Sequence, residues 1–235
     1  MATERKEQIA QTAAEAYARY QAALASHSLV QGQWQTKADD GRQLACALGV
    51  IGNIHSAGEC PAQIMPRWLA QMTVWLFDGQ KADDAFAWGE RFYAEIARLN
   101  GAVPFSVIHD WQANIVGPLA IEVAEKRKRN VEAHKALQAM QAAALAGKKF
   151  TADEWRPVLK AAFIDAYAYA DANADAYANA DADANAYADA NANAYAYAYA
   201  DANADAYADA DAKSAAVKRL ADGMVECLAR VPTSE

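Results

Sequence analysis

The sequence lacks the features that mark several classes of protein. Its three cysteines (46, 60 and 227) form no Cys-x-x-Cys pair, which fits reduced thiols in a cytoplasm rather than a disulfide framework. No run of about 18 apolar residues is present, so no membrane span is expected. The first residues lack the apolar core of a signal peptide. We therefore expect a cytoplasmic protein.

Known catalytic and ligand-binding motifs are also missing. The chain has no phosphate-binding glycine loop, no His-Glu-x-x-His and no nucleophile elbow. His55 and Cys60 could supply two metal ligands, but a structural zinc site needs four and no second pair follows. Ser106, His109 and Asp110 are the residue types of a hydrolase triad, yet neighbours on one helix rarely form one. We expect no metal, no cofactor and no catalytic residue. The sequence therefore favours a protein that is not an enzyme.

One long segment lacks glycine, proline and every large aliphatic side chain. From position 165 to 212 each even position is Ala, and the odd positions hold ten Asp, six Asn and eight Tyr. We call residues 165–212 the tract. Its ten Asp exceed the net charge of −8 for the whole chain, so the remainder carries +2. An acidic segment of this kind disfavours nucleic acid and anionic membranes as its partners.

Three structures compete for the tract. Strict alternation is the pattern of a half-buried strand, but it continues far beyond a usual strand length, and Ala, Asp and Asn are depleted in strands. Half of the positions hold Ala, the best helix former, and the sequences on both sides are helical in pattern. A compact β-solenoid with Ala inside and disorder are the alternatives. A helix is the leading prediction, and it would extend about 70 Å.

The tyrosines of the tract recur at a regular interval. A spacing of ten residues separates five of them, which would stack as a ladder if one solenoid coil held ten residues. Tyrosine also supplies adaptable contact area for a partner. The candidate interaction residues in the tract are therefore Tyr167, Tyr177, Tyr187, Tyr197 and Tyr207.

Residues 1–164 show helical periodicity and contain all six Trp. Helices are expected over 3–26, after an Asp39 or Asp40 cap, and from Pro66. No strand is predicted outside the tract. The clearest helix starts after an Asp83 or Asp84 cap and ends at Asn100-Gly101.

The second half of this region gives three further expectations. A helix that begins at Pro104 should bend or break at Gly117-Pro118. Thr151 and Glu154 form a capping box, although Pro157 follows closely enough to shift the helix start. His134 lies among charged residues on an expected solvent face. The chain is thus predicted to be all-α, with a helical domain at 1–164, the tract at 165–212 and an amphipathic helix at 213–235.

A basic run lies between two of the predicted helices. Lys126, Arg127, Lys128 and Arg129 follow one another, and they could bind phosphate groups, serve as a docking surface or contact the acidic tract. A solvated helix face is the more common reason for such a run. We name these four residues as candidate interaction residues.

The order of parts resembles one group of proteins. Residues 60–69 read Cys-Pro-Ala-Gln-Ile-Met-Pro-Arg-Trp-Leu, residues 104–111 read Pro-Phe-Ser-Val-Ile-His-Asp-Trp, and residues 154–160 read Glu-Trp-Arg-Pro-Val-Leu-Lys. With the tract and the short closing helix that follow, the chain is similar to uncharacterised proteins of phage and prophage regions. The resemblance implies a bacterial or phage cytoplasmic setting and a tract that tolerates changes in length, but no activity. The strict alternation departs from the Tyr spacing of that group.

These observations favour a non-enzymatic interaction or assembly protein. Its acidic, Ala-rich tract would act as a spacer arm, with a protein partner or self-association as the expected mode of binding. One alternative is a solenoid whose Tyr, Asn and Asp surface binds an ordered target such as ice or a polysaccharide. Another is an acidic decoy for a basic protein.

Overall fold

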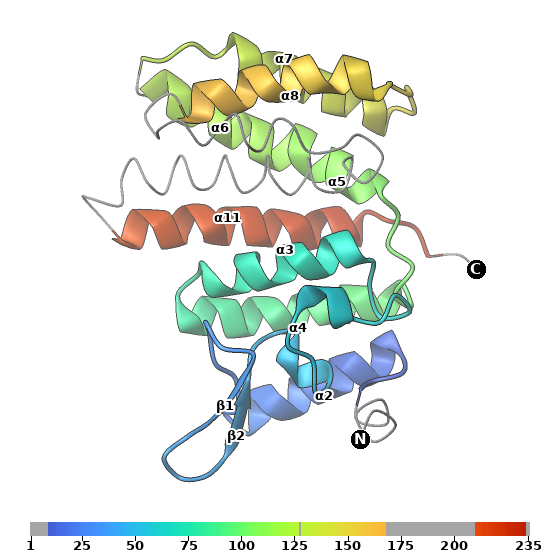
Figure 1. Cartoon of the computed structure of the whole chain (residues 1–235), viewed down its shortest axis with the longest axis vertical. Coiled ribbons are helices and arrows are strands. Elements are labelled where there is room, and N and C mark those ends of the chain that lie inside the picture. Colours follow the sequence, from blue (N-terminus) through green and yellow to red (C-terminus); the bar gives the residue numbers. More distant parts are fainter. Residues whose placement is uncertain (1–8, 127, 168–209, 234–235) are drawn as a thin grey trace. The chain divides into compact units, whose positions relative to one another are not determined.

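The computed structural model describes residues 9–126, 128–167 and 210–233 (Figure 1). These residues divide into two compact units, which are described separately. Unit 1 comprises residues 1–104 and 217–235, and unit 2 comprises residues 105–216. Helices dominate both units, so the all-α class predicted from periodicity is confirmed.

Unit 1 is built on three helices from the first half of the chain: α2 (Ala13–Ala25), α3 (Arg67–Asp78) and α4 (Ala82–Arg98). The first of these starts later than predicted from the 3–26 pattern. Its N-cap is Thr12, whose hydroxyl accepts from the backbone N–H of Glu15 at 3.1 Å. Capping therefore fixes the start, because it satisfies a backbone donor that the first turn leaves without a helical partner.

The ends of α4 partly match the prediction. Neither Asp83 nor Asp84 is the cap, because Lys81 occupies the N-cap position and both aspartates lie in the first turn. Their negative charges suit that position near the positive end of the helix dipole. At the other end Gly101 has a φ of +76°, and its N–H donates to Ile96 O at 3.0 Å, so the predicted Gly terminator is confirmed.

The helix predicted after Asp39 or Asp40 does not form. A hairpin takes its place, with β1 (Gln35–Lys37) antiparallel to β2 (Gln43–Ala45). Asp40 and Gly41 lie in the turn, and Gly41 has a φ of +84°. The prediction of no strand outside the tract is therefore wrong. The single turn η1 (Gly49–Ile51) follows the hairpin, and η2 (Ala57–Glu59) lies before α3.

The last helix, α11 (Ala210–Ala229), returns the chain to unit 1 (Figure 1). Trp88 Nε1 on α4 donates to Ala221 O at 2.8 Å across 133 residues of sequence. The apolar face expected of this amphipathic helix is buried. Val217, Leu220, Met224 and Leu228 are each at most 2% exposed.

Unit 2 begins with one helical run from Ser106 to Lys126. It consists of α5 (Ser106–Trp111), the π-helical segment η3 (Gln112–Val116) and α6 (Gly117–Lys126). Of the two predicted outcomes at Gly117-Pro118, a bend or a break, the break does not occur, because the run continues from η3 into α6. A proline ring clashes with the carbonyl four residues earlier in an α-helix, and here that residue, Asn114, lies in the wider π turn.

Two antiparallel helices complete unit 2: α7 (Glu132–Leu145) and α8 (Ala152–Tyr167). The predicted capping box is present, since Thr151 N–H donates to Glu154 Oε2 at 2.7 Å and Glu154 N–H donates to Thr151 Oγ1 at 3.4 Å. Pro157 lies inside α8 without shifting its start. The helix α7 contacts α5, η3, α6 and α8, which makes it the centre of this unit.

The described structure reaches the tract only at its two ends. Its first residues, 165–167, belong to α8, and its last, 210–212, belong to α11. The predictions of a helix, a solenoid or disorder for residues 168–209 lie outside the described residues. Of the helices that the structure does describe, none is both long and apolar enough to cross a membrane.

Candidate functional site

A polar groove in unit 1 is the candidate binding site. It has a volume of about 510 Å³ and lies where α2, the hairpin and η1 meet. Small residues form much of its surface, among them Ala23, Ala45 and Gly49. Its polar side chains are those of Arg19, Ser28, Gln35, Gln43 and Asn53.

Two long side chains hold the walls of the groove in place. Arg19 donates from Nη1 to Ile51 O at 2.9 Å and from Nη2 to Glu15 Oε1 at 2.6 Å, which ties α2 to η1. Gln35 Nε2 donates to Gly49 O at 3.3 Å and Gly52 O at 3.1 Å, which ties the hairpin to the same turn. The positions of both side chains are thus fixed by backbone carbonyls.

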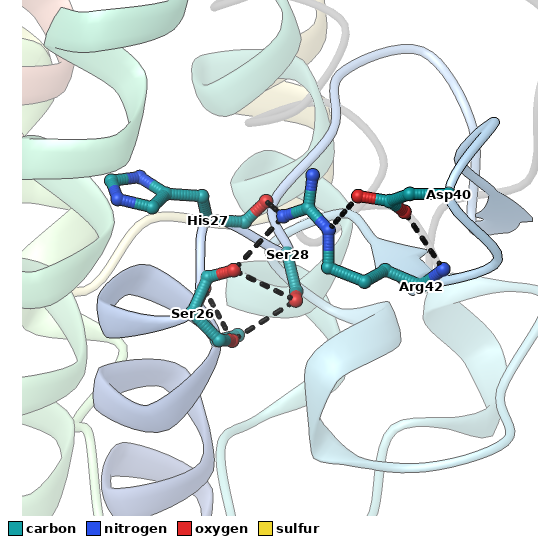
Figure 2. A network of polar contacts seen from close by, with 6 residues as sticks. Ser26, His27, Ser28, Asp40 and Arg42 are labelled. Atoms are coloured by element: carbon teal, nitrogen blue, oxygen red, sulfur yellow. Dashed lines mark hydrogen bonds and ion pairs between the residues drawn. The ribbon is translucent and has the colours of Figure 1, made fainter.

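Arg42 connects the hairpin turn to the C-terminal end of α2 (Figure 2). Its Nη1 donates to Ser26 O at 3.0 Å and His27 O at 2.8 Å, and its Nε donates to Asp40 Oδ2 at 2.6 Å. The backbone N–H of Arg42, followed by its guanidinium, lowers the pKa of Asp40. Figure 2 also shows Ser28, which lines the groove, bonded to Ser26. This network holds the hairpin beside α2 and so shapes the groove.

The composition of the groove fits binding better than acid–base chemistry. No Asp, Glu, His or Cys is among the described residues that line it. Its hydrogen-bonding groups are amides, one hydroxyl and one guanidinium, and none of these exchanges a proton near neutral pH. The groove therefore offers donors and acceptors but no general base.

A second polar cluster surrounds His109 in unit 2. His109 Nδ1 lies 2.7 Å from Gln141 Oε1, so an amide oxygen accepts from the ring. The ring stacks on Trp155 with centroids 6.0 Å apart and planes 4° apart, and Phe105 meets it edge-on. The buried side chain of Asp110 accepts from Asn114 Nδ2 at 2.7 Å. These contacts join α5, α7 and α8, and an amide, not a carboxylate, orients the Nδ1 side of the imidazole.

The other histidines and cysteines show no metal centre. His55 Nε2 lies 2.9 Å from Asn53 Oδ1, and Cys60 Sγ donates weakly to Pro61 O. Burial raises the pKa of Cys60 to about 12, which disfavours the thiolate that a metal requires. No group of three or more potential metal ligands occurs among the described residues. His134 is only 4% exposed, so its predicted position on a solvent face is wrong.

The predicted interaction residues lie mostly beyond what the structure describes. Tyr167 belongs to α8, but its side chain is not described. Outside the described residues lie Tyr177, Tyr187, Tyr197, Tyr207 and Arg127.

The described part of the basic run ends a helix. Lys126 is the last residue of α6, and its Nζ donates to Glu122 Oε1 at 2.7 Å. The backbone N–H groups of Lys128 and Arg129 donate to Glu125 O and Ala124 O. Lys128 has a φ of +55°, so the run does not continue as a helix face.

The chain matches no protein family, no curated protein and no solved structure. The candidate site therefore depends on geometry alone. Sequence patterns gave little signal for the groove, because its residues come from four separate segments and none belongs to a known motif. One available signal was Asp40-Gly41, a dipeptide typical of hairpin turns.

Proposed function

We propose that the chain is a non-enzymatic assembly protein that contacts its partners through the acidic tract. One observation carries the proposal: both ends of the tract continue from folded helices, α8 of unit 2 and α11. The tract is thus a connection with a folded helix at each end. The eight carboxylates that lie between these two helices can engage a basic or hydrogen-bonding partner at several points.

The test is sedimentation velocity on the full-length chain and on a variant with the ten Asp of residues 165–212 replaced by Asn. This change keeps length and alternation but removes ten negative charges. We expect the wild-type chain to associate, with itself or with an added basic protein such as lysozyme, at about 20 mM salt. We expect much less association at about 500 mM salt, where the Debye length falls below about 5 Å. Equal association of both chains at low salt would contradict the proposal.

An acidic decoy for one basic protein is a second candidate, favoured by the charge of the tract. It predicts a saturable 1:1 complex with that protein and no self-association. The surface-binding solenoid stays a prediction. Far-ultraviolet circular dichroism of a peptide covering 165–212 tests it, because a β spectrum would favour the solenoid over the helix.

A further inference from the structure

The outer edge of β1 presents hydrogen-bonding groups that no described residue uses. In the hairpin, Cys46 N–H donates to Trp34 O and Ala38 N–H donates to Arg42 O. Backbone groups alternate sides along an antiparallel strand, so the N–H and C=O of the intervening residues 35 and 37 point away from β2. Throughout the described ranges, no backbone or side-chain group bonds them.

The opposite edge of the hairpin is already covered. Ala45 N–H donates to Ser28 O at 3.0 Å, and Val30 N–H donates to Ala45 O at 3.0 Å. A bridge between Leu29 and Ala45 marks the same pairing. At Ala45 the edge of β2 is therefore closed to an added strand, whereas β1 has no such partner at Gln35 or Lys37 among the described residues.

The free edge and the groove share Gln35. Its backbone belongs to the edge, while its side chain lies in the groove. Gln43 and Lys37 are cross-strand partners, so their side chains lie on the same face of the hairpin as Gln35. The edge supplies main-chain hydrogen bonds, and the neighbouring groove supplies contacts for side chains. Together they have the two components of strand-addition recognition.

The lining selects for acidic or amide side chains on the added strand. Groove residues contribute the hydroxyl of Ser28 and the amides of Gln43 and Asn53, with no carboxylate among those described. The Arg19 guanidinium also lines the groove, but Glu15 already balances its charge. The exposed Lys37 adds a positive charge beside the edge. Small residues such as Ala45 and Gly49 leave room for methyl groups.

The tract has the complementary pattern. In an extended stretch its Ala methyls would lie on one side and its Asp, Asn or Tyr side chains on the other. We infer that the edge of β1 and its groove bind an extended stretch of the tract from a second copy of the chain. This inference rests on the proposed function and names the receptor for the tract.

The length of the tract favours a second copy. A stretch of about five residues spans roughly 17 Å, which covers β1 and the residues beside it. The 42 residues between α8 and α11 are long enough for about eight such stretches, whereas the groove of the same chain could use one. Several copies can thus bind one tract, and linked weak contacts strengthen one another.

The binding test uses a fluorescein-labelled peptide with the sequence of residues 201–211, titrated with the full-length protein and followed by anisotropy. Lys37→Pro removes an outward N–H that the hairpin does not need, whereas Lys37→Ala removes the charged side chain beyond Cβ and keeps that N–H. We expect Lys37→Pro to weaken binding at least about tenfold, and Lys37→Ala to weaken it less. The matched control Lys135→Glu, at an exposed lysine on α7, should leave binding unchanged.

A second probe avoids any doubt about folding of the variants. The same peptide, N-methylated at alternate residues, cannot donate to the strand edge and should not bind wild-type protein. Equal binding of the methylated and unmethylated peptides would overturn the inference. So would equal binding of the peptide to wild-type protein and to Lys37→Pro.

Sedimentation then identifies the source of the tract. We expect assemblies that grow with protein concentration and disperse with excess peptide. A monomer at every concentration that nevertheless binds the peptide would overturn the second copy as the source. If the tract binds lysozyme but the peptide does not bind the groove, the inference fails and the proposed function stands.

Discussion

Gly89 is a position in unit 1 where an added methyl group has no room. A Cβ there would overlap the ring and hydroxyl of Tyr20, which is fully buried. Tyr20 donates to Phe86 O at 3.1 Å and stacks on Tyr93 with centroids 5.1 Å apart. The absence of a side chain at Gly89 is what lets α2 approach α4 so closely.

We expect Gly89→Ala to destabilise the protein by about 1–2 kcal/mol. Alanine gains about 1 kcal/mol in helix propensity, but overpacking costs about 1–3 kcal/mol. The upper part of that range, about 2–3 kcal/mol, applies because Tyr20 cannot move without losing its own contacts. Urea unfolding followed by tryptophan fluorescence measures the difference. Gly58→Ala is the control, because its nearest neighbour, Ser56 Oγ, would be 3.7 Å away. A Gly89→Ala variant as stable as wild type would contradict this view of the α2–α4 contact.

Single residues also show where sequence patterns stop being informative. The burial of Trp88 and Leu220 follows from helical periodicity, which records which face of a helix is apolar. The burial of His134 does not, because its neighbours in sequence are charged and the residues that cover it come from elsewhere in the chain. The cap of α4 was also misassigned, because Lys81 holds the N-cap position without a side-chain hydrogen bond.

Among the helices and strands, α11 depends on a polar contact at its C-terminal end. Arg98 of α4 donates to Leu228 O at 2.7 Å and to Val231 O at 2.9 Å, and it also bonds Glu95. The last carbonyls of a helix have no partner within the helix, so a cation there satisfies both hydrogen bonding and the helix dipole.

Arg98→Gln should lower the free energy of unfolding by about 1–2 kcal/mol. This is the lower end of the range for hydrogen bonds to a charged group, because the side chain of Arg98 is 31% exposed. In the same variant, hydrogen exchange of the backbone amides in the last turn of α11 should be faster than in wild type. Arg156→Gln is the matched control, since that arginine makes an exposed ion pair with Asp153, and it should cost less than about 0.5 kcal/mol. Unchanged exchange in α11 of the Arg98→Gln variant would argue against the capping role.

The hairpin explains why the candidate site itself was not predicted. Each of its strands has three residues, too few for an alternating pattern to stand out from a helical one. Leu44, Leu48 and Ile51 fit a helical spacing, yet Leu44 lies in a strand and the other two lie beyond it. Long helices can be predicted from the sequence, whereas the groove is formed by short elements and backbone carbonyls.

At the scale of the molecule, unit 1 is assembled from two separated parts of the chain. Residues 1–104 supply most of its core, and α11 adds Val217, Leu220, Met224 and Leu228 after unit 2 and the tract intervene. Amphipathic periodicity indicates that α11 has an apolar face but not which helices cover it. The sequence alone therefore does not predict that α11 pairs with α4.

A variant in which a flexible linker of about 30 residues replaces 105–216 should still unfold cooperatively, because it keeps the whole core of unit 1. A chain that ends at residue 209 should instead lose its sharp thermal transition for this unit. Near-ultraviolet circular dichroism during heating shows whether each of these two variants unfolds in a sharp transition. The same melting temperature for unit 1 in the chain ending at 209 and in wild type would show that α11 is dispensable.

Because unit 1 is made of two separated parts of the chain, it cannot fold completely while its first part is being synthesised. Domains usually fold in order as they emerge, N-terminal first. Here the Ala221 carbonyl that accepts from Trp88 Nε1 is translated more than a hundred residues after that tryptophan, so unit 1 cannot be completed until α11 has been made. A polypeptide released before α11 would carry an open hydrophobic surface and be exposed to chaperones and proteases, so completion of unit 1 reports that α11 has been translated.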